Sequence, residues 1–194
     1  MMHRHSTTTL VLAAAVALAA TGVQADSVYT KNDREPCEVL EEYEGGGRDL
    51  RCPGYEDYDV FVHEGDARVD VDFGSSNDSF ETFSAFNGDG ETVEWLTDSR
   101  GMPYAAVLRF FIDVDGRAAQ ALVVSRVGTE RNPGCVVGVV DAASDQANGV
   151  ARGLGAMAPL FDCATDKVVM VMVPGTSPLV REFGGANGTT GASE

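Results

Sequence analysis

The chain has 194 residues, and its 30 Asp and Glu against 14 Lys and Arg give a formal net charge of −16. Only two of the basic residues, Lys31 and Lys167, are lysines. Nucleic acid and anionic membrane surfaces are therefore disfavoured as partners, because binding to phosphates requires a basic face. A basic protein is an admissible partner. The alternative is an acidic surface that serves only solubility, for instance in a salty medium.

Residues 1–25 have the pattern of a secretory signal peptide. Arg4 supplies a basic start, residues 10–20 form an apolar run, and Val23 and Ala25 are small residues at the positions that signal peptidase reads. The run is shorter than the roughly 20 apolar residues that span a bilayer. We predict cleavage after Ala25, no membrane span afterwards, and a periplasmic or secreted location. Loss of Arg4 would leave 13 basic against 30 acidic residues, a net charge of −17.

Residues 26–173 are sufficient for a single domain with its own core. The stretch 174–194, rich in Gly, Thr, Ser and Asn, is predicted to be a disordered tail. All four cysteines lie in the exported part, where two disulfides are expected; three pairings are possible, and spacing favours Cys37–Cys52 and Cys135–Cys163. Metal binding by cysteines is the rival interpretation, but it requires close pairs such as C-x-x-C, which the sequence lacks.

The sequence predicts two hairpins in the first part of the domain. Strands at 37–43 and 48–52 flank a glycine-rich turn and would be joined by the first disulfide. The stretch 52–74 predicts a second hairpin with a two-residue turn at Gly65-Asp66. In that register the apolar face pairs Val62 with Val69, Val60 with Val71 and Tyr58 with Phe73. The other face, expected to be exposed, carries a possible binding surface of Asp59, Phe61, His63, Arg68, Asp70 and Asp72.

The middle of the chain predicts the strongest hairpin. A polar connection at 77–91, with three phenylalanines, leads to a short strand at 92–96. Strands at 103–114 and 117–127 then meet at Asp115-Gly116, a combination that favours a type I′ turn. In this register Leu108 pairs with Val123, Phe110 with Ala121, and Ile112 with Ala119. Apolar residues on both faces, including Val107, Phe111, Leu122 and Val124, indicate a strand pair in the middle of a covered sheet.

The cover is expected from one helix near the C-terminus. A strand at 134–141 precedes the stretch 142–159, which ends at Pro159 and shows a helical apolar stripe of Ala147, Val150, Ala151, Leu154, Met157 and Ala158. A last strand is predicted at 167–173. The fold class that follows is α+β: a mostly antiparallel sheet of hairpins with one covering helix and two disulfides.

No residue pattern predicts a catalytic, cofactor or metal site. His63 is the only histidine of the exported part, and no G-x-S-x-G motif accompanies it. Glu64 with Asp70 or Asp72 could form a glycosidase pair, but exposed hairpin residues should keep ordinary pKa values, whereas an acid catalyst needs a raised one. The turns at 113–116 and 87–91 lack the complete ligand pattern of a calcium loop.

The pattern of "CPGY", "EGD", "ETVEW" and "VLRFF", with the late cysteine pair around a helix, resembles a family of exported alphaproteobacterial proteins. The resemblance spans most of the exported part. It implies export and an envelope location, and it implies no activity, cofactor or site residue, because none is assigned to that family.

Two classes of function remain. The first is a non-enzymatic envelope protein, a binding or accessory module, one version of which is an inhibitor of a basic lysozyme-type hydrolase. The second is a carboxylate-dependent hydrolase acting on envelope polymer. A deep cleft with two buried carboxylates would favour the hydrolase, and a shallow acidic face would favour the binding module. The oligomeric state is left open.

Overall fold

The structure is a computed structural model that describes residues 26–77, 79–174 and 183–184. Its larger sheet has six strands, antiparallel except for the last pair. Their spatial order is β1 (Asp26–Lys31), β7 (Phe86–Thr97), β8 (Pro103–Val114), β9 (Arg117–Arg126), β10 (Cys135–Asp141) and β11 (Val169–Val171).

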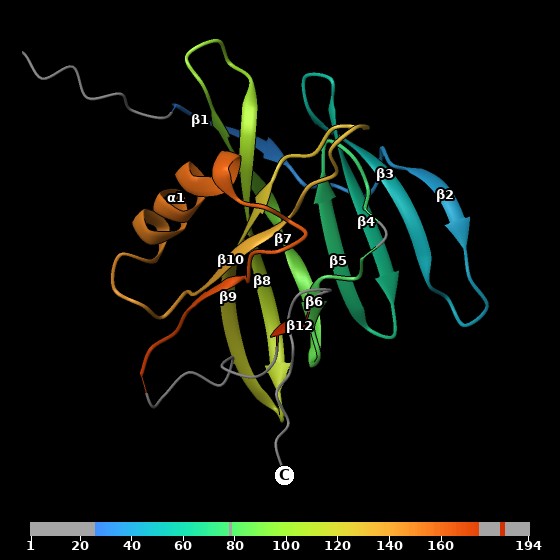
Figure 1. Cartoon of the computed structure of the whole chain (residues 1–194). Helices are drawn as coiled ribbons and strands as arrows, with labels where there is room; N and C mark the ends of the chain where they lie inside the picture. Colours follow the sequence, from blue (N-terminus) through green and yellow to red (C-terminus); the bar gives the residue numbers. More distant parts are fainter. Residues whose placement is uncertain (1–25, 78, 175–182, 185–194) are drawn as a thin grey trace, which may run out of the picture.

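A second sheet lies against one face of the first (Figure 1). Its four antiparallel strands, in spatial and chain order, are β2 (Glu38–Glu42), β3 (Arg48–Tyr55), β4 (Tyr58–Gly65) and β5 (Arg68–Phe73). A short ladder joins β6 (Thr82–Phe83) to β12 (Phe183–Gly184). The antiparallel hairpins expected from the sequence are therefore present.

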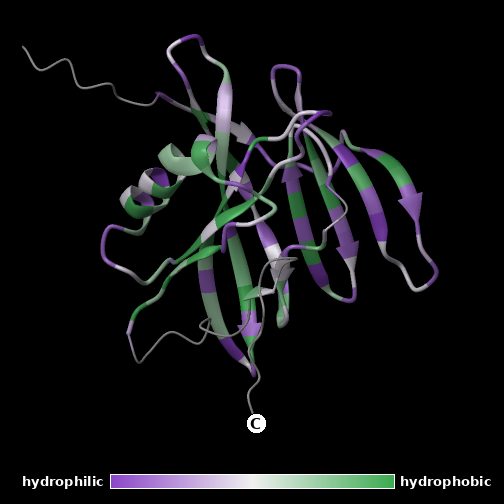
Figure 2. Cartoon of the chain, in the orientation of Figure 1, coloured by the Kyte–Doolittle hydropathy of each residue, from purple (hydrophilic) through white to green (hydrophobic). Residues whose placement is uncertain are grey.

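The main core lies between the two sheets. Hydrophobic and hydrophilic residues alternate along β3 and β4 (Figure 2), so each strand directs one apolar row inward. Trp95 of β7 is fully buried and meets Phe73 of β5 edge to face, with ring centroids 5.4 Å apart. The strands of both sheets contribute the surrounding aliphatic side chains, among them Leu50, Val60, Val62, Val71, Leu108, Phe110, Ile112 and Val123.

The other face of the six-stranded sheet carries a smaller apolar cluster and the helix α1 (Ala147–Met157), which a short 3-10 turn, η1 (Ala158–Leu160), extends. Ala151 is buried against Val107, Leu122 and Val124, as the helical stripe predicted. Met157, also in that stripe, is exposed, and so is Phe111, on the same side of β8 as Val107. The helix thus packs on part of this face.

Both predicted disulfides, Cys37–Cys52 and Cys135–Cys163, are confirmed. The first joins the segment before β2 to β3, and the second joins β10 to the segment after the helix. Such bonds are consistent with an oxidising compartment outside the cytoplasm. None of the described helices has the length and apolar character that a membrane crossing requires.

Two predicted boundaries differ from the structure. The connection expected at 77–91 contains β6 and the first half of β7, because Phe86 to Asp89 pair with β8. In the stretch expected to be a disordered tail, Phe183 is buried against Phe83 and pairs with it in the β6–β12 ladder. The predicted leader, 1–25, and the other residues beyond 174 lie outside the described part of the chain.

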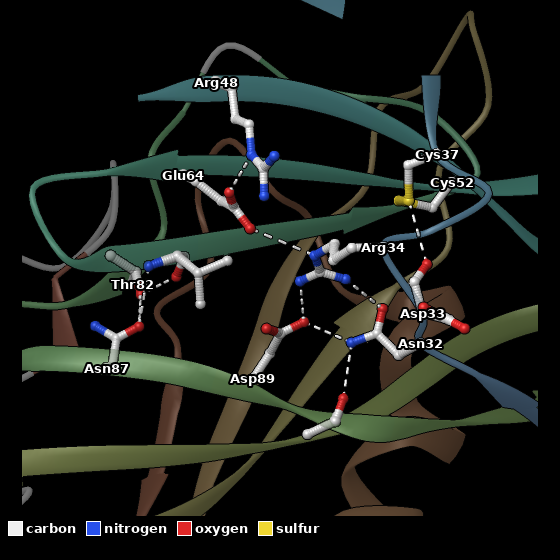
Figure 3. A network of polar contacts seen from close by, with 12 residues as sticks. Asn32, Asp33, Arg34, Cys37, Arg48, Cys52, Glu64, Thr82, Asn87 and Asp89 are labelled. Atoms are coloured by element: carbon white, nitrogen blue, oxygen red, sulfur yellow. Dashed lines mark hydrogen bonds and ion pairs between the residues drawn. A yellow bond between two sulfur atoms is a disulfide. The ribbon is translucent and has the colours of Figure 1, made fainter. Parts of the chain in front are cut away.

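A polar network connects the two sheets (Figure 3). The guanidinium of Arg34, in the segment after β1, donates to Asp89 of β7 and, at 3.4 Å, to Glu64 of β4. Asn32 donates to Asp89 as well, and Arg48 of β3 donates to the other oxygen of Glu64 at 2.6 Å. This network fixes β4 relative to β7 and leaves Glu64 paired with two cations.

Candidate functional site: a buried His–Asp cluster beside an acidic concavity

The β4–β5 hairpin has a register two residues away from the predicted one. Its turn is centred on Asp66 and Ala67, so Val62 pairs with Val71 and Val60 with Phe73. A shift of two residues preserves the face on which each side chain lies. The apolar row therefore still points to the core. On the other face His63 lies directly opposite Asp70, and Phe61 opposite Asp72.

The expectation that this outer face is exposed is wrong for Asp70 and Asp72. Asp70 and Asp72 are 1 % and 5 % exposed. The segment that follows β5 returns over them: Asn77 donates its backbone N–H to Asp72 at 2.9 Å and its side-chain amide at 2.7 Å. Glu81, also buried, accepts the backbone N–H of Val136 at 2.9 Å. Hydrogen bonds from this segment therefore enclose a polar sheet face.

His63 sits at the boundary between this buried cluster and solvent, with its side chain 19 % exposed. Its Nδ1 lies 3.0 Å from a carboxylate oxygen of Asp49, on β3. On the other side of the ring, Nε2 lies 3.1 Å from the hydroxyl of Ser76 and 3.6 Å from a carboxylate oxygen of Asp72. The imidazole is thus held between two carboxylates from different strands.

Asp70 is the least satisfied member of the cluster. The backbone N–H of Glu81 bonds to its carboxylate, yet its Oδ2 is fully buried and has no hydrogen-bond partner. A buried polar atom without a partner destabilises the folded state by about 1–3 kcal/mol. The cluster therefore costs stability.

The environment shifts the pKa values of these groups upward. Burial, and then the charge of Asp72, raise the pKa of Asp70 to about 8. Burial also raises the pKa of Asp72 and of Glu81. The hydrogen bond with Asp72 is the main cause that raises the pKa of His63 to about 9. The ordinary pKa values expected for exposed hairpin residues are therefore incorrect here, since these residues are enclosed.

Asp49, His63 and Ser76 have the order of contacts of a catalytic triad, but the surroundings do not suit that chemistry. A triad histidine must be neutral to accept the serine proton, whereas the raised pKa makes His63 an imidazolium near neutral pH. The N–H after a nucleophilic serine commonly serves the oxyanion hole. Here that N–H, of Asn77, donates to Asp72. The arrangement therefore does not suit acyl transfer.

A concavity of about 800 Å³ opens beside the cluster. Its lining includes His63, Asp49, Ser76 and Asn77, together with Tyr43, Glu44, Asp66, Arg68 and Phe80. Asp70 and Asp72 do not line it and lie behind His63. The concavity is therefore separated from the buried acids by residues that contact them, among them His63 and Asn77.

The other members of the predicted binding surface lie apart from this cluster. Asp59 is partly exposed and 3.9 Å from Arg51. Phe61, expected to be exposed, is only partly accessible. Arg68 pairs with Asp66 and stacks over the ring of Phe80, 5.7 Å from its centroid. The six residues share a face, but the structure brings only His63, Asp70 and Asp72 together as ligand-type groups.

Sequence reasoning missed Asp49, Ser76, Asn77 and Glu81. In the correct register the pattern of a histidine opposite one aspartate and beside a second would have indicated the cluster. The remaining contacts come from other strands and from the returning segment. Strand periodicity carries no signal for them.

A second feature stands at the edge of the four-stranded sheet. All five residues of the outer strand β2 are exposed: Glu38, Val39, Leu40, Glu41 and Glu42. Val39 and Leu40 are each 48 % exposed, and Tyr43, next in the chain, is 46 % exposed. Figure 1 shows this strand at the margin of the molecule. We call residues 38–44 the acidic edge.

Comparisons of the chain with protein-family models, with curated proteins and with solved structures find no match.

Proposed function

We propose that the protein is an exported, non-enzymatic binding module that docks a basic protein along the acidic edge. The observation that carries this proposal is an outer strand whose five residues are all exposed, with three glutamates flanking the adjacent aliphatic residues Val39 and Leu40. The predicted leader, the two disulfides and the family resemblance support an envelope or extracellular location.

The composition of the acidic edge favours a basic partner over a second copy of this chain. An outer strand can accept an additional strand from a partner, and charged residues on such edges oppose self-association. Two copies would bring Glu38, Glu41 and Glu42 against one another. A basic segment would instead pair with these glutamates while Leu40 and Val39 contact its apolar side chains.

The edge leads directly into the concavity. Tyr43 and Glu44 follow β2 and line its rim. Tyr43 donates to Asp49 at 2.6 Å, which connects the rim to the residue that holds His63. A basic side chain of the partner would enter between Glu44 and Asp66. A basic lysozyme-type hydrolase fits this description of the partner.

Binding to a basic lysozyme tests the proposal, measured by calorimetry at low salt and at about 0.15 M, where the Debye length is about 8 Å. Specific binding should persist at the higher salt. Leu40→Ser should weaken affinity about tenfold or more, because interface energy resides in apolar anchors. Glu41→Gln with Glu42→Gln should mainly slow association.

The matched control removes two exposed acids from the other sheet and its loops, Asp113→Asn with Glu130→Gln. It should change affinity less than about twofold at about 0.15 M salt. Loss of all binding at that ionic strength, or equal effects of the edge and control variants, would show that the acidity serves solubility alone.

A carboxylate-dependent hydrolase is the second candidate, favoured by the buried Asp70 with its raised pKa. Glycosidase carboxyls are about 5–5.5 Å apart in retaining enzymes and farther in inverting ones. Carboxylate oxygens of Asp70 and Asp72 approach within 4.8 Å, and neither residue lines the concavity. Release of soluble fragments from purified envelope polymer, abolished by Asp70→Asn, would favour the hydrolase over the binding module.

A further inference from the structure

We propose that His63, Asp70 and Asp72 form a binding site for one divalent transition-metal ion, with Zn²⁺ as the test ion. Each of the three side chains places one ligand-type atom within 4.8 Å of the other two. Strand pairing fixes this arrangement, because His63 and Asp70 are direct cross-strand partners and Asp72 lies two residues farther on the same face. The site is separate from the acidic edge and does not depend on the proposed docking.

Asp70 supplies the observation that points to a ligand. Its side chain is 1 % exposed, and Oδ2 is buried without a hydrogen-bond partner. Asp70 accepts the backbone N–H of Glu81, but this bond leaves its Oδ2 without a partner. A cation bound between Asp70, Asp72 and His63 would supply a partner for this buried carboxylate oxygen.

The groups around the cluster are arranged as in the outer shell of a metal site. Histidine ligands commonly donate the other ring N–H to a carboxylate, which fixes the ring and its tautomer. His63 makes this contact, from Nδ1 to Asp49 at 3.0 Å, and so directs Nε2 toward the acids. Asp72 is in turn held by two hydrogen bonds from Asn77. Two of the three ligands are therefore positioned before an ion arrives.

The spacing and the donor types fit zinc. Ligands about 2.0–2.1 Å from a tetrahedral ion lie roughly 3.3 Å from one another, and His63 Nε2 lies 3.6 Å from Asp72 Oδ2. One imidazole and two carboxylates suit Zn²⁺ and related ions, whereas Ca²⁺ takes six to eight oxygens. Two carboxylates also neutralise the dipositive charge.

The concavity gives the ion a path to the cluster, since His63 and Ser76 lie in its lining. The ion would replace the hydrogen bond between Nε2 and the Ser76 hydroxyl. A water molecule from the concavity then occupies the fourth position, as in zinc sites that have three protein ligands. Ser76 is therefore a neighbour of the site and not a required ligand.

Calorimetric titration of ZnCl₂ into the chelator-treated full chain, prepared without a histidine tag, tests the site. We expect saturable binding of one ion, with Ca²⁺ and Mg²⁺ binding far more weakly. His63→Gln and Asp70→Asn should each lower the Zn²⁺ affinity about 100-fold or more, and Asp49→Asn about tenfold, as outer-shell changes do. Co²⁺ should give the visible absorption band of a tetrahedral complex.

Two variants serve as controls. Asp59→Asn removes a partly exposed acid of the same hairpin and should leave the affinity within about twofold, as should Ser76→Ala. His3 and His5 are present in every variant, so they cannot produce the difference. The thermal unfolding midpoint of each variant without metal shows that it folds. The absence of saturable Zn²⁺ binding, or equal affinity of the wild type and folded Asp70→Asn, would overturn the proposal.

Discussion

The β8–β9 and β4–β5 hairpins both direct an apolar row into the shared core, but their outer faces are buried in different ways. Part of the outer face of β8–β9 is apolar and buried, where Val107, Leu122 and Val124 pack against α1. The outer face of β4–β5 is polar and is enclosed by the hydrogen-bonded segment after β5. Burial stabilises the first arrangement, whereas in the second it leaves Asp70 with an unpaired atom.

The turns of the two hairpins also differ, and again the β4–β5 hairpin is the less favourable one. Both have two central residues with positive φ: 53° and 75° at Asp115-Gly116, and 52° and 54° at Asp66-Ala67. Glycine adopts this conformation without strain, whereas alanine does so at a cost of about 1–2 kcal/mol. The β4–β5 hairpin thus contains strain at its turn and an unsatisfied group on its outer face. Such local costs are typical of binding sites.

Truncation of the shared core should have the largest effect on stability. Leu108→Ala on β8 should lower the free energy of unfolding by about 3–4 kcal/mol, since it removes apolar contacts and leaves a cavity. Val62→Ala on β4 should lower it by about 2 kcal/mol, because fewer carbon atoms are lost. Urea unfolding measures both. A change below about 1 kcal/mol at either position would show that the sheets do not share one close-packed core.

Asp70→Asn should have the next largest effect, and its sign depends on pH. The pKa of Asp70 is raised from 3.8 to about 8 in the folded state, so the folded protein binds more protons than the unfolded one between these values. Its contribution to stability is therefore present below pH 3.8 and is lost as pH rises through 8. In chelator-treated protein, Asp70→Asn should be more stable than the wild type at pH 8, by about 1–3 kcal/mol.

The pH profile separates Asp70 from the groups that face it, which are His63, Asp72 and Glu81. His63 also has a raised pKa, of about 9, so its contribution is present below pH 6.5 and is lost as pH rises through 9. His63→Gln should flatten the upper part of the profile, and Asp70→Asn the lower part. Parallel profiles for the wild type and Asp70→Asn between pH 4 and 8 would contradict the enclosed position of Asp70.

The two turns should show the smallest effects, with opposite signs. Ala67→Gly should stabilise the protein by about 0.5 kcal/mol, since relief of the positive φ exceeds the entropy that glycine adds to the unfolded chain. Gly116→Ala should destabilise it by about 1 kcal/mol through backbone strain alone, because a Cβ there meets no atom within 4 Å. Thermal unfolding compares the pair. Destabilisation by Ala67→Gly would mean that the positive φ at Ala67 carries no strain.

The same two hairpins show when strand register can be predicted from the sequence. In the β8–β9 hairpin, the residues of the Asp115-Gly116 turn and the pattern of apolar residues both predict the same register. The predicted pairs Leu108–Val123, Phe110–Ala121 and Ile112–Ala119 are confirmed. In the other hairpin the valines alternate, so a slip of two residues preserves the apolar face. Only the turn distinguishes these registers, and the true turn contains alanine where glycine is usual.

By itself, the sequence determined the elements that depend on neighbours in the chain: the hairpins, their inward faces, the helix after β10, and cysteine pairs separated by 15 and 28 residues. Periodicity and turn residues are local properties, so they can be inferred without a structure. Only the tertiary structure decided that the polar face of the β4–β5 hairpin is buried. Asp49 comes from another strand and Asn77 from a returning loop, and their enclosure of His63, Asp70 and Asp72 changes the pKa values. Burial by distant segments is a non-local property, and it converted an expected solvent-facing surface into a candidate site.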